Sequence, residues 1–147
     1  MRPFVVCAAI VLSLVACRSS TGVDLNQQEE LTQHERQWDH RNFHSYSFVY
    51  ASQILGINPT VRITVRNDVV VSAIDVSTDQ AADSRLSWPT IDGVFAVAQD
   101  GLSTEGTIVH VDYDLQYGFP DQLSLQARVA NPGGGYQSTI SSLQPLD

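Results

Sequence analysis

An imidazole and two carboxylates alternate with apolar side chains along one segment of the chain. The segment from Ile108 to Asp114 reads as a strand in which His110, Asp112 and Asp114 share one face. In a strand, neighbouring Cβ atoms on one face lie about 6.5–7 Å apart. Such a set could bind a divalent cation, or it could act as the acid/base pair of a small hydrolase.

The same alternation has a simpler explanation. Any half-exposed antiparallel strand places polar residues on the side that faces water, and we favour this interpretation for the His110 face. Asp121, just past the following turn, could join Asp112 and Asp114 around Ca²⁺, although the spacing is not that of an EF-hand. The sequence therefore predicts that the protein holds no metal and no cofactor. If it does bind a metal ion, His110, Asp112 and Asp114 are the candidate ligands.

Three histidines gather near the end of the first predicted helix. His40 and His44 are four residues apart, and His34 precedes them. The zinc-protease pattern requires His-Glu-x-x-His, but His34-Glu35 is followed by Arg-Gln-Trp, so that pattern is absent. We interpret this group as a solvated helix end.

No motif for a nucleophile or for phosphate binding accompanies these polar groups. The chain contains neither Gly-x-Ser-x-Gly nor Gly-x-Gly-x-x-Gly. It has two cysteines, of which Cys7 lies in an apolar leader and Cys17 directly follows that leader. The pattern favours a non-enzymatic binding domain over an enzyme.

The leader resembles the signal peptide of bacterial lipoproteins. Arg2 precedes a twelve-residue apolar stretch, residues 4–15, which is too short to span a bilayer. The sequence Leu14-Val15-Ala16-Cys17 is similar to a lipobox. The resemblance implies that residues 1–16 are removed and that Cys17 carries a diacylglyceryl group and an acylated amino terminus, which together anchor the protein in a membrane.

The residues after Cys17 predict where the domain works. Residues 17–24 form the lipidated cysteine and a short polar tether of roughly 20 Å, which keeps the domain close to the bilayer. Arg18 stands where an Asp retains enterobacterial lipoproteins at the inner membrane. We therefore expect a cell-envelope protein, held at the outer membrane and facing the periplasm if the source has two membranes.

Composition restricts the remaining chain to one acidic domain, residues 25–147. Apolar residues make up 43% of the 147 residues, and charged residues make up 16%. Sixteen acidic residues against eight arginines and no lysine give a net charge of −8, which argues against nucleic acid as a partner. The expected partners are membrane lipid and an envelope protein or glycan.

Periodicity predicts a helix, three strands, a second helix and three more strands. A helix capped by Asp24 or Asn26 runs to Arg41. A second helix begins after Thr90 and stops at Gly101. Six segments alternate as strands: 46–50, 61–66, 69–74, 107–114, 122–129 and 136–143. The fold class is α+β, a two-layer sandwich of an antiparallel sheet with both helices packed on one face.

The lipobox and three short motifs within this domain together resemble a family of small bacterial lipoproteins that is known only as a domain of unknown function. The resemblance covers residues 35–145 and implies an anchored α+β domain, without an activity, a cofactor or a catalytic residue. The motifs are the lipobox, Trp38 before Tyr46-x-Phe48, Thr90-Ile91-Asp92-x-x-Phe95, and Asp112-Tyr113-Asp114-x-x-Tyr117-Gly118-x-Pro120.

Overall fold

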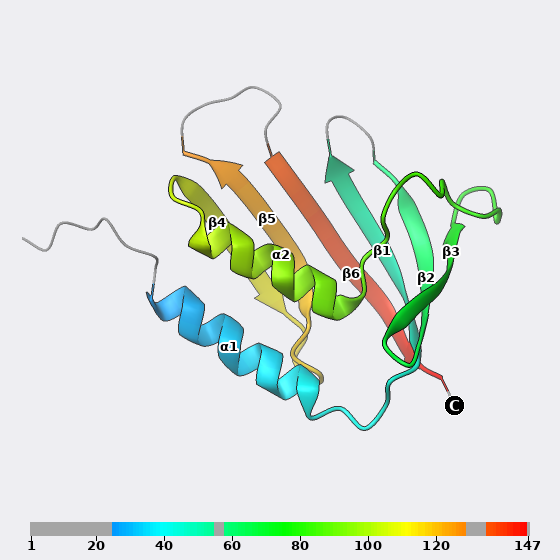
Figure 1. The fold of residues 1–147 in the computed structure, drawn as a ribbon, viewed down its shortest axis with the longest axis horizontal. Coiled ribbons are helices and arrows are strands. Elements are labelled where there is room, and N and C mark those ends of the chain that lie inside the picture. The colour runs from blue at the N-terminus through cyan, green and yellow to red at the C-terminus, as the bar shows by residue number, and fades with distance from the viewer. Residues whose placement is uncertain (1–24, 55–57, 129–134, 147) are drawn as a thin grey trace, which may run out of the picture.

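The computed structural model describes residues 25–54, 58–128 and 135–146 (Figure 1). Six strands form one antiparallel sheet in the order β3-β2-β1-β6-β5-β4. The predicted α+β class, the six-stranded antiparallel sheet and the two helices are confirmed. In chain order the elements are α1 (Leu25–Asp39), β1 (Tyr46–Ile54), β2 (Thr60–Arg66), β3 (Val69–Asp75), α2 (Ile91–Ser103), β4 (Thr107–Tyr113), β5 (Pro120–Ala127) and β6 (Gly135–Pro145).

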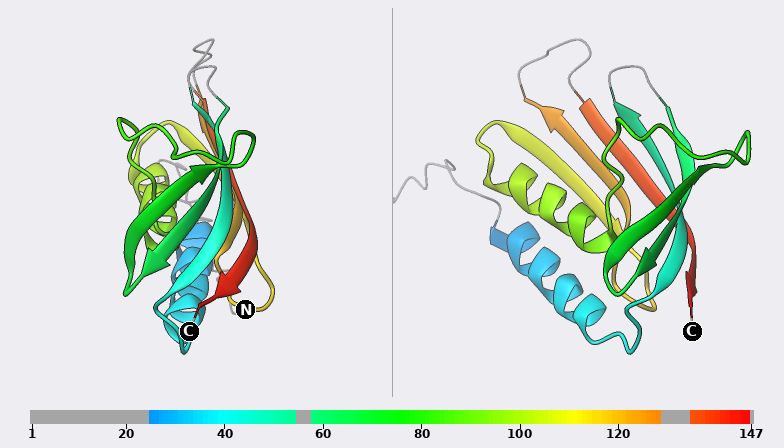
Figure 2. Two further views of the ribbon diagram at one scale, coloured as in Figure 1. Left: turned by 90° about the vertical axis from the view of Figure 1, so that its right-hand side faces the viewer. Right: turned by 45° about the vertical axis from the view of Figure 1, so that its right-hand side comes forward.

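Both helices lie on the same side of the sheet, as the turned views show (Figure 2). The strands bury alternate side chains toward the helices, because successive residues of a strand point to opposite faces. Tyr46, Phe48 and Tyr50 of β1 are all at most 4% exposed, as their alternation predicts. The same holds for Val61, Ile63 and Val65 of β2, whose exposures are at most 1%.

The second helix begins at the predicted residue. The Thr90 hydroxyl oxygen accepts a hydrogen bond from the backbone N–H of Gly93 at 3.1 Å, which satisfies one of the free donors of the first turn. Asp92 adds a negative charge to the positive end of the helix. Its apolar stripe is buried as predicted and comprises Ile91, Val94, Phe95, Ala98 and Leu102.

The prediction that Gly101 ends this helix is wrong. Gly101 lies inside α2 and is buried, and a Cβ added to it would come within 2.6 Å of a Leu125 methyl group. The glycine therefore allows α2 to approach β5 closely. The helix ends at Ser103, and the left-handed conformation falls on Gly106, with φ of 79°.

The first helix is shorter than predicted. It ends at Asp39 rather than Arg41, and Asn26 lies within it rather than at its cap; Asp24 falls outside the described residues. Its buried residues are Leu31 and Trp38, seven positions apart. Its apolar stripe is therefore narrow, as predicted, and the helix lies beside α2 rather than over the middle of the sheet (Figure 1).

Residues 67–68 make the two-residue hairpin that joins β2 to β3. Asn67 and Asp68 have φ of 48° and 62°, and two consecutive positive φ angles are the mark of a type I′ turn. The predicted turns at residues 56–59 and 131–135 lie mostly outside the described residues. None of the described helices is long and apolar enough to cross a membrane.

The two halves of the chain occupy adjacent parts of the sheet. β1, β2 and β3 run from the centre of the sheet to one edge, and β4, β5 and β6 run from the other edge to the centre, so both halves cross the sheet in the same order. No residue-level similarity between the halves accompanies this repetition of a helix and three strands, and we treat it as a coincidence of pattern.

Candidate functional site

The face of the sheet that points away from the helices carries mostly uncharged polar side chains. We call it the uncovered face, because no described helix packs against it (Figure 2). The strand pairings place these side chains in two rows that cross four strands. The rows are Gln53–Gln137–Ser124–His110 and Ala51–Thr139–Gln122–Asp112.

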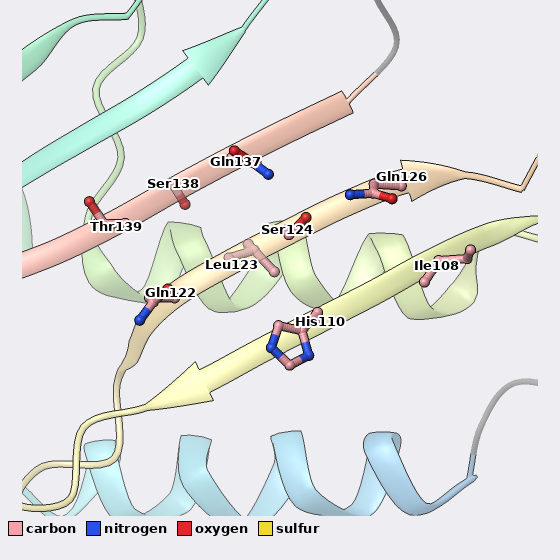
Figure 3. A pocket seen from close by; sticks show the side chains of 9 residues that line it. All are labelled: Ile108, His110, Gln122, Leu123, Ser124, Gln126, Gln137, Ser138 and Thr139. Atoms are coloured by element: carbon pink, nitrogen blue, oxygen red, sulfur yellow. The ribbon is translucent and has the colours of Figure 1, made fainter. Parts of the chain in front are cut away.

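A depression of about 430 Å³ lies over the His110 end of the uncovered face. Figure 3 labels its nine lining residues, which come from β4, β5 and β6. The polar members carry amide or hydroxyl groups, apart from the single imidazole of His110. Each amide or hydroxyl group can both donate and accept a hydrogen bond, so this surface suits a ligand with many hydroxyl groups.

His110 is poorly placed for catalysis. Its side chain is 71% exposed, and its Nε2 lies 3.5 Å from an Asp112 carboxylate oxygen that is itself exposed. Ser124 is its cross-strand neighbour, yet no hydrogen bond joins the two side chains in the described structure. A general base acts within about 2.6–3.2 Å of the proton that it removes, so this pair is not an activated nucleophile in the present geometry.

The prediction that Asp114 shares the strand face with His110 and Asp112 is wrong. The ladder shifts register after Asp112, and β4 ends at Tyr113. One Asp114 carboxylate oxygen instead accepts backbone hydrogen bonds from Gln116 at 3.0 Å and Tyr117 at 2.6 Å. An aspartate that binds the backbone two and three residues ahead organises a turn, so local turn chemistry overrides the strand pattern.

Asp121 lies near the carboxylates of Asp112 and Asp114. Burial, and then the charges of these two residues, raise the pKa of the Asp121 carboxyl above its usual value. Its Oδ1 is buried and has no hydrogen-bond partner among the described residues. Even so, no set of three or more Asp, Glu, His or Cys side chains within the described segments is arranged to hold a metal ion.

The triple substitution His110→Asn, Asp112→Thr and Asp114→Asn tests for a metal site here. We expect the free energy of unfolding to change by no more than about 0.5 kcal/mol per substitution, since His110 and Asp112 are exposed and the side-chain oxygen of an asparagine at position 114 can still accept the two backbone hydrogen bonds of the turn. We also expect Ca²⁺, Zn²⁺ and EDTA to leave the melting temperature of the natural chain unchanged. A metal at a hundred times its Kd would add about 2.7 kcal/mol. A metal-dependent rise that the triple substitution removes would contradict the prediction.

The three histidines near the end of α1 do not form a cluster. His34 stacks on Tyr113 with 3.9 Å between ring centroids, and His44 Nδ1 lies 2.8 Å from an Asp68 carboxylate oxygen. His40 is exposed beyond the end of the helix. Burial raises the pKa of the Tyr113 hydroxyl, and the charge of Glu30 raises it further.

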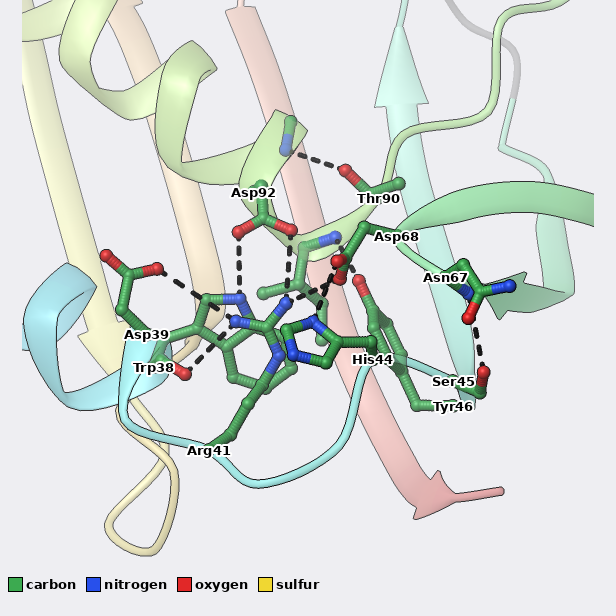
Figure 4. Close-up of polar contacts among 12 residues, drawn as sticks. Trp38, Asp39, Arg41, His44, Ser45, Tyr46, Asn67, Asp68, Thr90 and Asp92 are labelled. Carbon is green, nitrogen blue, oxygen red and sulfur yellow. Dashed lines mark hydrogen bonds and ion pairs between the residues drawn. The ribbon is translucent and has the colours of Figure 1, made fainter. Parts of the chain in front are cut away.

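A buried arginine organises the end of α1 (Figure 4), and sequence reasoning missed it. The side chain of Arg41 is only 5% exposed, and its Nη2 lies 2.8 Å from a carboxylate oxygen of Asp68 in the β2–β3 turn. Its Nη1 donates to the backbone oxygen of Trp38 at 3.1 Å. Its guanidinium carbon also lies 4.0 Å from the centre of the Trp38 ring, which is a cation–π contact.

The indole of Trp38 extends this network to α2. Its Nε1 donates to one carboxylate oxygen of Asp92 at 3.0 Å, while the other oxygen lies 3.7 Å from Arg41. Tyr46 accepts a hydrogen bond from the backbone N–H of Ile91 at 3.4 Å, and burial raises its pKa to about 12. These contacts join α1, the β2–β3 turn and the start of α2, so we interpret the cluster as structural.

The fold and the site define a small α+β domain with an antiparallel sheet, two helices, and a polar sheet face that no described helix covers. The chain belongs to a family of unknown function (DUF6174), whose model matches residues 30–145. No curated protein and no solved structure matches it. The predicted membership of a family of unknown function is thereby confirmed. Trp38, Tyr46 and Asp92, which belong to the motifs noted in the sequence, meet in the cluster of Figure 4.

Proposed function

We propose that this protein is a lipid-anchored component of a bacterial cell envelope that binds a neutral envelope glycan and catalyses no reaction. The observation that carries the proposal is the uncovered face, with its two rows of amide and hydroxyl side chains. Two-layer packing supports it, because a sheet with both helices on one side leaves the other side free to bind.

A glycan suits this surface better than a protein. Protein interfaces have apolar and aromatic cores, whereas the depression near His110 contains no aromatic residue other than the imidazole. Ile108, which is 49% exposed, is its only exposed large aliphatic side chain. The chain is acidic overall, but these rows contain one carboxylate, Asp112, so a hydroxyl-rich neutral ligand meets little repulsion.

Matched glutamine substitutions test the uncovered face. We expect Gln137→Arg to reduce co-sedimentation with cell-wall polysaccharide from the source bacterium by at least about fivefold, because hydrogen bonds at the centre of the row are lost. Gln33→Arg makes the same change on the exposed surface of α1 and should leave binding unchanged. Equal binding by both variants, or binding only to envelope proteins, would refute the assignment. Release of soluble sugar would show that the protein is an enzyme.

Lipid anchoring is proposed from the lipobox, whose residues lie outside the described ones. We expect Cys17→Ala to move the protein from the membrane fraction to the soluble fraction and to leave the leader attached, since the thioether cannot form. Cell fractionation with intact-mass analysis measures both effects. The natural chain should begin at a lipidated Cys17, and an unmodified amino terminus elsewhere would contradict the anchoring.

A further inference from the structure

A second cavity, of about 580 Å³, lies where the segment between β3 and α2 passes the start of β2. It is separate from the uncovered face and shares no residue with the depression near His110. Its volume falls in the range of sites that bind small molecules. The lining residues are Asn58, Pro59, Val61, Asp75, Ala82, Asp83, Arg85, Leu86 and Trp88.

Backbone hydrogen bonds hold one wall of this cavity in place. The N–H of Ala82 donates to the oxygen of Ala73 at 2.9 Å, and the N–H of Asp75 donates to the oxygen of Gln80 at 2.8 Å. The segment that follows β3 therefore returns along the edge of the sheet as a bridge. A wall fixed in this way supports a pre-formed cavity.

The charged groups at the cavity all have polar partners within the protein. Both oxygens of Asp83 accept hydrogen bonds from Arg85, at 2.6 to 3.1 Å, and this arginine holds the pKa of the Asp83 carboxyl at about 2. The carboxylate of Asp75 accepts hydrogen bonds from Ser77 and from the backbone of Thr78. No charge among the described lining residues lacks a partner, so the cavity suits an uncharged ligand.

The indole of Trp88 adds an apolar surface and an unsatisfied donor. Its Nε1 is buried, and no group in the described residues accepts its hydrogen. Buried tryptophan N–H groups normally have an acceptor. Leu86, at 40% exposure, and Pro59 extend the apolar lining. The Nε1 atom is covered in the present side-chain arrangement, so a ring with an attached oxygen would cover the apolar surface and would supply the missing acceptor once the indole turns toward the cavity.

We propose that this cavity binds an uncharged cyclic small molecule that carries a carbonyl or hydroxyl oxygen. Three simple probes separate the parts of the proposal: benzamide has the ring and the oxygen, toluene has only the ring, and benzoate carries a charge. The chain has two tryptophans, so two indole N–H signals are expected in a ¹⁵N spectrum, and the variant Trp88→Phe assigns them.

We expect benzamide to shift the Trp88 indole signal saturably and to leave the Trp38 signal in place. Benzamide should bind about two- to tenfold more tightly than toluene, the effect of one neutral hydrogen bond, and more tightly than benzoate. In the Trp88→Phe variant, backbone signals should show benzamide and toluene binding equally. The proposal would be overturned if the Trp88 signal did not shift at the solubility limit of benzamide, or if both indole signals shifted equally.

Discussion

Replacing Phe95 by alanine should lower the free energy of unfolding by about 3–5 kcal/mol, the usual cost of truncating a buried aromatic ring. Phe95 is 2% exposed and lies on the buried stripe of α2. A domain of this size has only about 5–15 kcal/mol of stability, so the variant should melt far below the natural chain or fail to fold. Urea unfolding followed by circular dichroism measures the change.

A truncation at an exposed position provides the control for Phe95→Ala. Val71 is 56% exposed at the edge strand β3, and Val71→Ala should change the stability by no more than about 0.5 kcal/mol. If Phe95→Ala were equally mild, α2 could not pack against the sheet as described.

Trp38→Ala should be similarly costly, about 3–5 kcal/mol, because the indole is completely buried among aromatic rings. It packs edge-on against Phe43, Tyr46 and Phe119, with ring centroids 5.4 to 6.0 Å away. Thermal unfolding of the variant beside the natural chain measures the loss. If Trp38→Ala melted at the same temperature as the natural chain, the packing of the Trp38 indole in the core would be contradicted.

The milder variant Trp38→Phe separates the ring from its hydrogen bond. Phenylalanine keeps an aromatic surface but cannot donate to Asp92, so part of the loss should depend on that carboxylate. A double-mutant cycle with Asp92→Ala should give a coupling energy of about 1 kcal/mol. A coupling energy near zero would assign the whole effect of Trp38 to packing.

Local periodicity was sufficient to predict the core. The alternation from Tyr46 to Tyr50 and the helical spacing from Ile91 to Leu102 placed the buried side chains correctly, because burial on one face is what produces these periods. The Asn67-Asp68 turn was equally accessible, since few residues tolerate its two positive φ angles.

Features that depend on contacts distant in sequence could not be predicted in this way. Gly101 resembles a helix stop until Leu125, which comes from another strand, is seen against it. Arg41 reads as a charge at a helix end, and only the fold brings Asp68 to its guanidinium group. Asp114 fits the strand alternation, but the turn after β4 captures its carboxylate. The uncovered face required the strand order, which alternation leaves open.

The position of β6 determines when the chain can acquire its structure. This strand follows the other five described strands in the sequence, yet it pairs with both β1 and β5 at the centre of the sheet. Without β6, no backbone hydrogen bonds join the strands β1–β3 to the strands β4–β5. A chain that lacks β6 therefore cannot close its sheet. Loss of the last dozen residues would divide the sheet rather than trim its edge.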